Sequence, residues 1–149
     1  MNPDYFGSSE RPLYGVYQPP AARQARDLGV LVCPPIGHEY LRTHWAVRQL
    51  AGQLSRGGAH VLRFDYTGTG DSWGDLKHGG LDVWTRDIRT ALDDLRDEAG
   101  VSRVAVVGLR MGATLAALSG LKAERMLLWD PVLNGADYFE QLAHISTPA

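Results

Sequence analysis

An apolar run of four residues, Val104–Val107, leads directly into a turn in which glycines at positions 108 and 112 flank Arg110. Continuous apolar runs of this length are typical of strands that are buried on both faces of a sheet. Glycines on either side of one residue suit a sharp, strained turn, because Cβ atoms there would collide. The segment therefore predicts a buried strand, a tight turn that exposes Arg110, and a helix from about Met111 to Ser119.

Two further units of the same kind precede it. Apolar strands are predicted at Gly29–Cys33 and His60–Phe64, and apolar residues at helical spacing follow each of them. We expect Thr43 to cap the first helix and Gly57 to end it, and the second helix to end at Gly100. The apolar faces of these helices are Val47, Leu50, Ala51 and Leu54 in the first, and Trp84, Ile88, Leu92 and Leu95 in the second.

Two more strands are predicted near the ends of the chain, Tyr14–Tyr17 as a hairpin or edge element and Arg125–Trp129 as a last strand. The strand before the arginine turn is expected to begin at Val101. Strands that alternate with helices of this length predict an α/β fold, a doubly wound and mainly parallel sheet with flanking helices. Loops at the carboxyl ends of the strands then open onto one edge of the sheet, where they can share a pocket.

Composition excludes several classes of protein. The chain has 149 residues, of which 44% are hydrophobic, so residues 1–149 are expected to form a single domain. A net charge of −2, with acids and bases interspersed, predicts neither nucleic acid nor membrane as a partner. No apolar run approaches the roughly 20 residues that span a bilayer, and the polar start lacks a signal-peptide pattern. A cytoplasmic location is expected.

No cofactor and no metal site is predicted. Cys33 is the only cysteine, so an intrachain disulfide is excluded and a buried thiol is expected. His38, Glu39 and His44 match no spacing that is typical of metal ligands. The glycines at 68 and 70 resemble part of a dinucleotide-binding loop, but no third glycine falls at the required position.

Four segments, in order, resemble the α/β-hydrolase family over roughly residues 12–140. Residues 33–39 look like its oxyanion-hole loop, and residues 65–72 look like a loop of its serine aminopeptidase-like members. Residues 108–113 resemble the nucleophile elbow Gly-x-Ser-x-Gly, and residues 128–132 the end of the sixth strand. The Pro-Pro-x-x-x-Glu loop is similar to that of the exosortase-system-associated hydrolases. The resemblance implies a truncated α/β-hydrolase fold without the last strands, which carry the catalytic acid and histidine.

Arg110 occupies the position of the nucleophilic serine in this resemblance. A guanidinium stays protonated and has no lone pair for attack on a carbonyl, so no nucleophile is expected at the elbow. One interpretation is a site for a carboxylate or phosphate, built from Arg110 and Met111 together with the loop residues Ile36, Gly37, His38 and Glu39. The other is that Arg110 forms an ion pair with Glu39 or Asp130 and only fills the pocket.

Other residues give weaker candidates for catalysis. Asp130 stands at the end of a predicted strand, and His144 follows on the next segment. Together with Ser72 they are candidates for a substitute triad. However, Asp71 and Ser72 also suit a turn, in which the hydroxyl bonds the backbone.

The last predicted strand, Arg125–Trp129, would be an apolar edge. Such an edge favours a protein partner or self-association, unless residues 134–144 cover it as a helix with Ala136, Phe139, Leu142 and Ala143 facing inward. The favoured function is therefore a non-catalytic α/β-hydrolase-fold subunit or accessory protein that binds a protein partner and an anionic ligand at Arg110. The alternatives are an active hydrolase of ester, amide or peptide bonds completed by a partner chain, and a remnant without a distinct role.

Overall fold

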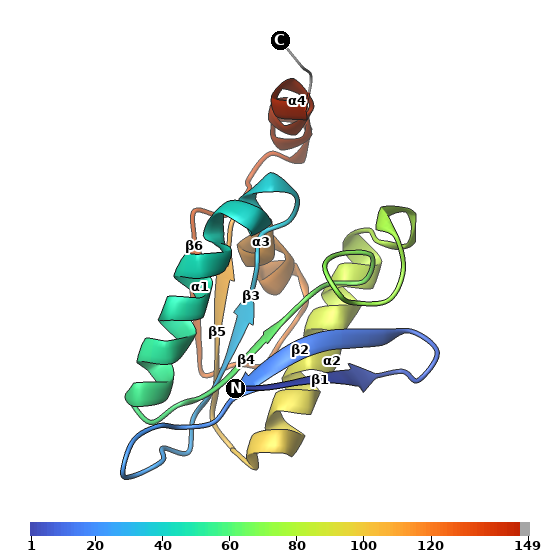
Figure 1. Cartoon of the computed structure of the whole chain (residues 1–149). Coiled ribbons are helices and arrows are strands. Elements are labelled where there is room, and N and C mark those ends of the chain that lie inside the picture. Colours follow the sequence, from blue (N-terminus) through green and yellow to red (C-terminus); the bar gives the residue numbers. More distant parts are fainter. Residues whose placement is uncertain (147–149) are drawn as a thin grey trace.

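The computed structural model describes the backbone of residues 1–146 and the side chains of residues 1–144. A six-stranded sheet forms its centre, in the order β1-β2-β4-β3-β5-β6 (Figure 1). The strands are β1 (Asn2–Gly7), β2 (Pro12–Gln18), β3 (Gly29–Cys33), β4 (His60–Phe64), β5 (Val104–Leu109) and β6 (Arg125–Trp129). The helices are α1 (His38–Arg56), the 3-10 turn η1 (Leu76–His78), α2 (Leu81–Ala99), α3 (Met111–Leu118) and α4 (Gly135–Ser146).

Helices lie on both faces of this sheet, as the alternating pattern predicts. The four strands from β4 to β6 are parallel, and β1 and β2 form an antiparallel hairpin beside β4. One core lies under α2 and α3, where Leu31, Ile88 and Leu115 are fully buried. A smaller core lies under α1 and contains Val32, Val61 and Ala51. The doubly wound, mainly parallel α/β sheet is therefore confirmed.

The predicted boundaries differ from the structure at three places. Helix α1 begins at His38, five residues before Thr43. It follows Gly37, which has a φ of 62°. Thr43 is not a cap, because its hydroxyl donates to the carbonyl of Glu39 inside the helix. Strand β5 begins at Val104 rather than Val101. Strand β1 was not predicted, because it has no continuous or alternating apolar pattern and owes its conformation to pairing with β2.

The carboxyl-terminal part of the described chain leaves β6 uncovered. Every residue of β6 is exposed, including Leu127 at 57% and Trp129 at 66%. Helix α4 forms, but it stands beyond the carboxyl edge of the sheet rather than beside β6 (Figure 1). Phe139, which was expected to face inward, is 54% exposed, and Tyr138 is the residue that α4 buries. The interpretation in which α4 covers the edge strand is therefore wrong.

Candidate functional site: an arginine at the elbow

The turn between β5 and α3 has the geometry of a strained elbow. Arg110 has a φ of 53° and a ψ of −118°, a conformation that is unfavourable for a residue with a side chain. A Cβ on Gly108 would lie 2.5 Å from the Cα of Ala113, and one on Gly112 would fall on the carbonyl oxygens of Cys33 and Pro34. Both glycines are therefore required, because the turn packs directly against neighbouring backbone.

Charged partners hold the Arg110 side chain from two directions. Its Nε donates to the carboxylate of Glu39 at 3.0 Å. Its Nη1 lies 3.2 Å from the carboxylate of Asp130 and donates to the carbonyl oxygen of that residue at 3.0 Å. Glu39 belongs to the first turn of α1, and Asp130 directly follows β6. The expected ion pair with Glu39 or Asp130 is thus present with both, and it ties together the loops after three adjacent strands.

The aromatic ring of Tyr138 closes this cluster from the side of α4. The guanidinium carbon of Arg110 lies 5.6 Å from the ring centroid, which is within the range of a cation–π contact. Tyr138 is only 3% exposed. Burial, together with the negative charge of Glu39, raises the pKa of its hydroxyl to about 12. The sequence held no signal for this contact, because the apolar pattern of α4 pointed to other residues.

The loop after β3 lies against the elbow, as the shared-edge argument predicts. Strands β3 and β5 are paired from Gly29 to Cys33, so the residues that follow them end at one edge of the sheet. Ile36 and Met111 are buried there, and Gly37 is exposed at the start of α1. Met111 is the first residue of α3, so its amide has no carbonyl of its own helix to bond. His38 is exposed and contributes no described contact to the Arg110 cluster.

The weaker catalytic candidates are not brought together. The Ser72 hydroxyl donates to the carbonyl oxygen of Asp65 and accepts from the amide of Tyr14 at 2.8 Å, so it serves the backbone of a turn. Ser72 follows β4 and Asp130 follows β6, and two strands lie between these. At the usual strand spacing that is a separation of about 14 Å. His144 is exposed in the last turn of α4. A substitute triad of these residues is not assembled in this structure.

A cluster of metal ligands and a membrane-spanning helix are both absent from residues 1–146. No group of three or more His, Cys, Asp or Glu side chains is placed to hold a metal ion among them. Cys33 is buried, and burial raises the pKa of its thiol above the usual range. Over the same part of the chain, no helix combines the length and the apolar character needed to cross a bilayer.

Comparisons with known proteins agree with this geometry. The family model for serine aminopeptidase, S33, matches residues 35–146. A lidless α/β serine hydrolase from Xanthomonas campestris superposes with a TM-score of 0.71 at 21% identity, over 84% of this chain and 58% of its own. An esterase from Pyrococcus furiosus superposes with a TM-score of 0.73 at 23% identity, over 99% of this chain and 56% of its own. Est1E from Butyrivibrio proteoclasticus, solved with ferulic acid, superposes with a TM-score of 0.69 at 19% identity, over 97% of this chain and 57% of its own. No curated protein matches the chain.

The matched residues include the elbow, the loop after β3 and the strand that precedes Asp130. The chain spans a little more than half the length of the solved structures to which it is similar. Its order of elements, with the elbow between β5 and α3, is that of an α/β hydrolase. The chain belongs to the serine aminopeptidase, S33, family of α/β hydrolases.

Proposed function

We propose that this chain is a non-catalytic α/β-hydrolase-fold module that binds a protein partner. The observation that carries the proposal is the Arg110 cluster. The residue at the nucleophile position has no nucleophilic atom, and its side chain is already engaged by Glu39, Asp130 and Tyr138. A substrate carbonyl would have to displace these contacts and would still find no group to attack it.

The charge of the cluster argues against an anionic ligand at Arg110. One guanidinium faces two carboxylates, so the cluster carries a formal charge of −1 at neutral pH. An added carboxylate or phosphate would meet like charges and would compete for donors that are already in use. The proposal therefore keeps the partner and gives Arg110 a structural role, in which it fixes the elbow to α1 and to the end of β6.

Strand β6 supplies the surface for the partner. All five of its residues are exposed, and Leu127 and Trp129 carry large apolar side chains on the same face. Its outer edge has no strand paired to it within the described residues. An apolar edge of this kind recruits a further strand, which gains backbone hydrogen bonds and covers the apolar side chains. We propose that the partner is a polypeptide segment that extends the sheet by pairing with β6.

The test combines identification of the partner with a matched pair of surface variants. The protein is purified from its own host, and the intact complex is weighed by native mass spectrometry. Leu127→Lys is expected to release the partner, whereas Leu76→Lys is expected to retain it, because Leu76 is 72% exposed on η1, away from β6. A complex that survives Leu127→Lys, or that is lost equally in both variants, would argue against the β6 interface.

A second candidate, a hydrolase completed by the partner, is favoured by one observation. The strained φ of Arg110 and both elbow glycines are retained, although an ion pair alone would not require them. The discriminating measurement is fluorophosphonate labelling of the purified complex. Labelling of either chain would support this hydrolase and would overturn the non-catalytic proposal, and its absence, with an esterase as the positive control, would support the proposal.

A further inference from the structure

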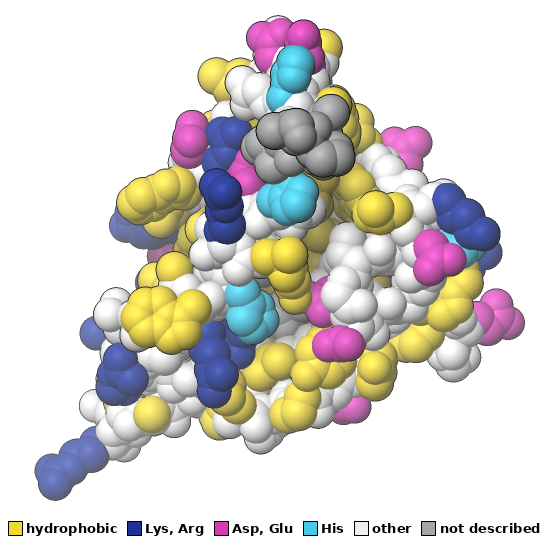
Figure 2. Space-filling view, turned by 45° about the horizontal axis from the view of Figure 1, so that its top comes forward, with side chains coloured by type: hydrophobic (Ala, Val, Ile, Leu, Met, Phe, Trp, Pro, Cys, Tyr) yellow, Lys and Arg dark blue, Asp and Glu magenta, His cyan; other side chains and the backbone are white. Residues whose placement is uncertain are grey.

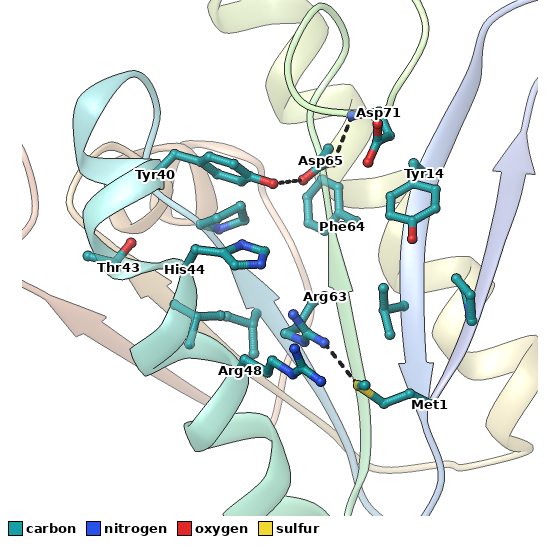
Figure 3. A pocket seen from close by; sticks show the side chains of 15 residues that line it. Met1, Tyr14, Tyr40, Thr43, His44, Arg48, Arg63, Phe64, Asp65 and Asp71 are labelled. Carbon is teal, nitrogen blue, oxygen red and sulfur yellow. Dashed lines mark hydrogen bonds between the residues drawn. The ribbon is translucent and has the colours of Figure 1, made fainter.

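A hollow lies on the α1 face of the sheet, and Arg110 is not among the residues that line it. It has a volume of about 370 Å³, at the lower end of the range for small-molecule pockets. Its walls are α1 on one side and strands β2 and β4 on the other (Figure 3). In Figure 2, basic side chains gather on the left, over α1, and acidic side chains lie across a hollow from them. The pocket therefore has two ends of opposite charge.

Two arginines form the basic end. Arg63 lies on β4, where its register partners are Val16 on β2 and Val32 on β3, so an arginine stands between two valines on the same face of the sheet. Arg48 reaches the pocket from α1, and both guanidinium groups are drawn side by side in Figure 3. Within the described residues, no carboxylate lies within 4.0 Å of either side chain, unlike Arg110.

The Arg63 side chain also keeps an unsatisfied donor. Its Nε is buried and has no hydrogen-bond partner among the described residues, and its Nη2 contacts only the thioether of Met1, at 3.5 Å. Burial and the neighbouring charge of Arg48 lower the pKa of Arg63, and the carboxylate of Asp65, which lies beyond ion-pair distance, offsets part of this effect. A partly desolvated guanidinium beside a like charge is unfavourable unless an anion joins it. The basic end thus has the donors and the charge that an anionic group requires.

The opposite end of the pocket carries negative charge from carboxylates. The carboxylate of Asp65 accepts hydrogen bonds from the hydroxyl of Tyr40 at 2.7 Å and from the amide of Asp71 at 3.0 Å. Asp71 and Tyr14 also line this end (Figure 3). Negative charge here repels an anion and so orients it toward the arginines. Between the ends, the wall is apolar and includes Val47.

We propose that this pocket binds a small phosphate monoester, with its phosphate on Arg48 and Arg63 and its apolar or aromatic body along the valine wall. Two guanidinium groups match the charge of a phosphate monoester, and their planar donors suit its oxygens. The exposed His44 borders the same space from α1 and adds a further donor. The site is separate from the Arg110 cluster, and its occupancy does not depend on whether the elbow is catalytic.

The experiment is a calorimetric titration of the purified chain with phenyl phosphate at constant ionic strength. We expect saturable binding to the wild-type protein, and binding at least about tenfold weaker in Arg63→Met and in Arg48→Gln. Arg42→Gln is the matched control, because Arg42 is an exposed arginine of the same helix that does not line the pocket. Phenol, which has the ring without the phosphate, is expected to show no binding at the same concentration.

Each outcome decides the proposal. Binding that is lost in Arg63→Met and Arg48→Gln but kept in Arg42→Gln supports it, and if Arg63→Met does not fold, the exposed Arg48 variant decides alone. No heat of binding at millimolar phenyl phosphate would overturn it. Equal affinity in all four proteins would also overturn it, because such binding would reflect the general charge of α1. Binding of inorganic phosphate as tight as that of phenyl phosphate would overturn the role of the apolar wall.

Discussion

Arg110 and Arg63 are two partly buried arginines of one sheet, and their surroundings differ in every respect. Arg110 follows β5 and is engaged by two carboxylates, a carbonyl oxygen and an aromatic ring. Arg63 lies within β4 between two valines, and its Nε has no partner among the described residues. The difference teaches that burial of a charge does not by itself indicate a role. We call Arg110, which is paired with carboxylates, the saturated arginine, and Arg63, whose Nε has no partner among the described residues, the unsaturated one. The first is part of the framework, and the second is available to a ligand.

The largest expected effect tests the backbone on which this comparison depends. Gly112→Ala places a Cβ on the carbonyl oxygens of Cys33 and Pro34, which are main-chain atoms and cannot move aside cheaply. We expect a loss of about 3 kcal/mol or more in the free energy of unfolding, measured by urea denaturation. Gly120→Ala is the control. Gly120 has a φ of 70° but open space around it, so the loss should be about 1 kcal/mol.

Replacement of the saturated arginine should be the next largest effect. Arg110→Met leaves the carboxylates of Glu39 and Asp130 without their shared partner, although Asp130 remains largely exposed to water. We expect the free energy of unfolding to fall by about 1–2 kcal/mol. The double variant Arg110→Met with Glu39→Gln should recover part of that loss, because it removes the less exposed lone carboxylate. Unchanged stability in the single variant would contradict the structural role of Arg110.

Replacement of the unsaturated arginine should have the opposite sign. Arg63→Met removes a partly desolvated charge that lies beside Arg48 and has no ion-pair partner among the described residues. A thioether side chain fits between Val16 and Val32 without a polar atom to satisfy. We expect stability to be unchanged or to rise by up to about 1 kcal/mol in the same denaturation assay. A loss as large as that of Arg110→Met would mean that the two arginines are equivalent.

The smallest effect appears only at high pH. Burial and the charge of Glu39 raise the pKa of Tyr138 to about 12, so the folded protein holds this proton to higher pH than the unfolded chain does. The stability that this proton contributes is complete below pH 10 and is lost as the pH rises toward 12. Wild-type protein should therefore lose stability relative to Tyr138→Phe over that interval. Parallel curves for the two proteins would exclude Tyr138 as the cause.

The fold and the elbow could be predicted from the sequence because their signals are local. Apolar runs mark β3 and β5, and the glycine pair marks a turn that only a missing Cβ permits. Ion pairing of Arg110 with Glu39 or Asp130 was also predictable, since the carboxyl ends of parallel strands meet at one edge. These features follow from patterns within single segments and from the sheet topology that those patterns imply.

The features that could not be predicted from the sequence depend on contacts between distant segments. Strand β1 has no apolar pattern of its own and forms by pairing with β2. Tyr138 reaches Arg110 from a helix whose apolar spacing favoured Phe139. The pocket beside Arg63 could not be predicted either, because the segment His60–Phe64 was interpreted only as an apolar strand. Which side chain lacks a partner can be seen only once all neighbours are placed.

The exposed β6 also affects how residues 1–149 behave in solution. A strand with exposed leucines and a tryptophan offers the same template to every other copy of itself, at a rate that rises with concentration. Without an occupant on that edge, concentrated samples of residues 1–149 are expected to aggregate through edge-to-edge pairing of β6 strands, even though each molecule is correctly folded. A segment that pairs with β6, as proposed above, would therefore also act as a solubility factor for residues 1–149.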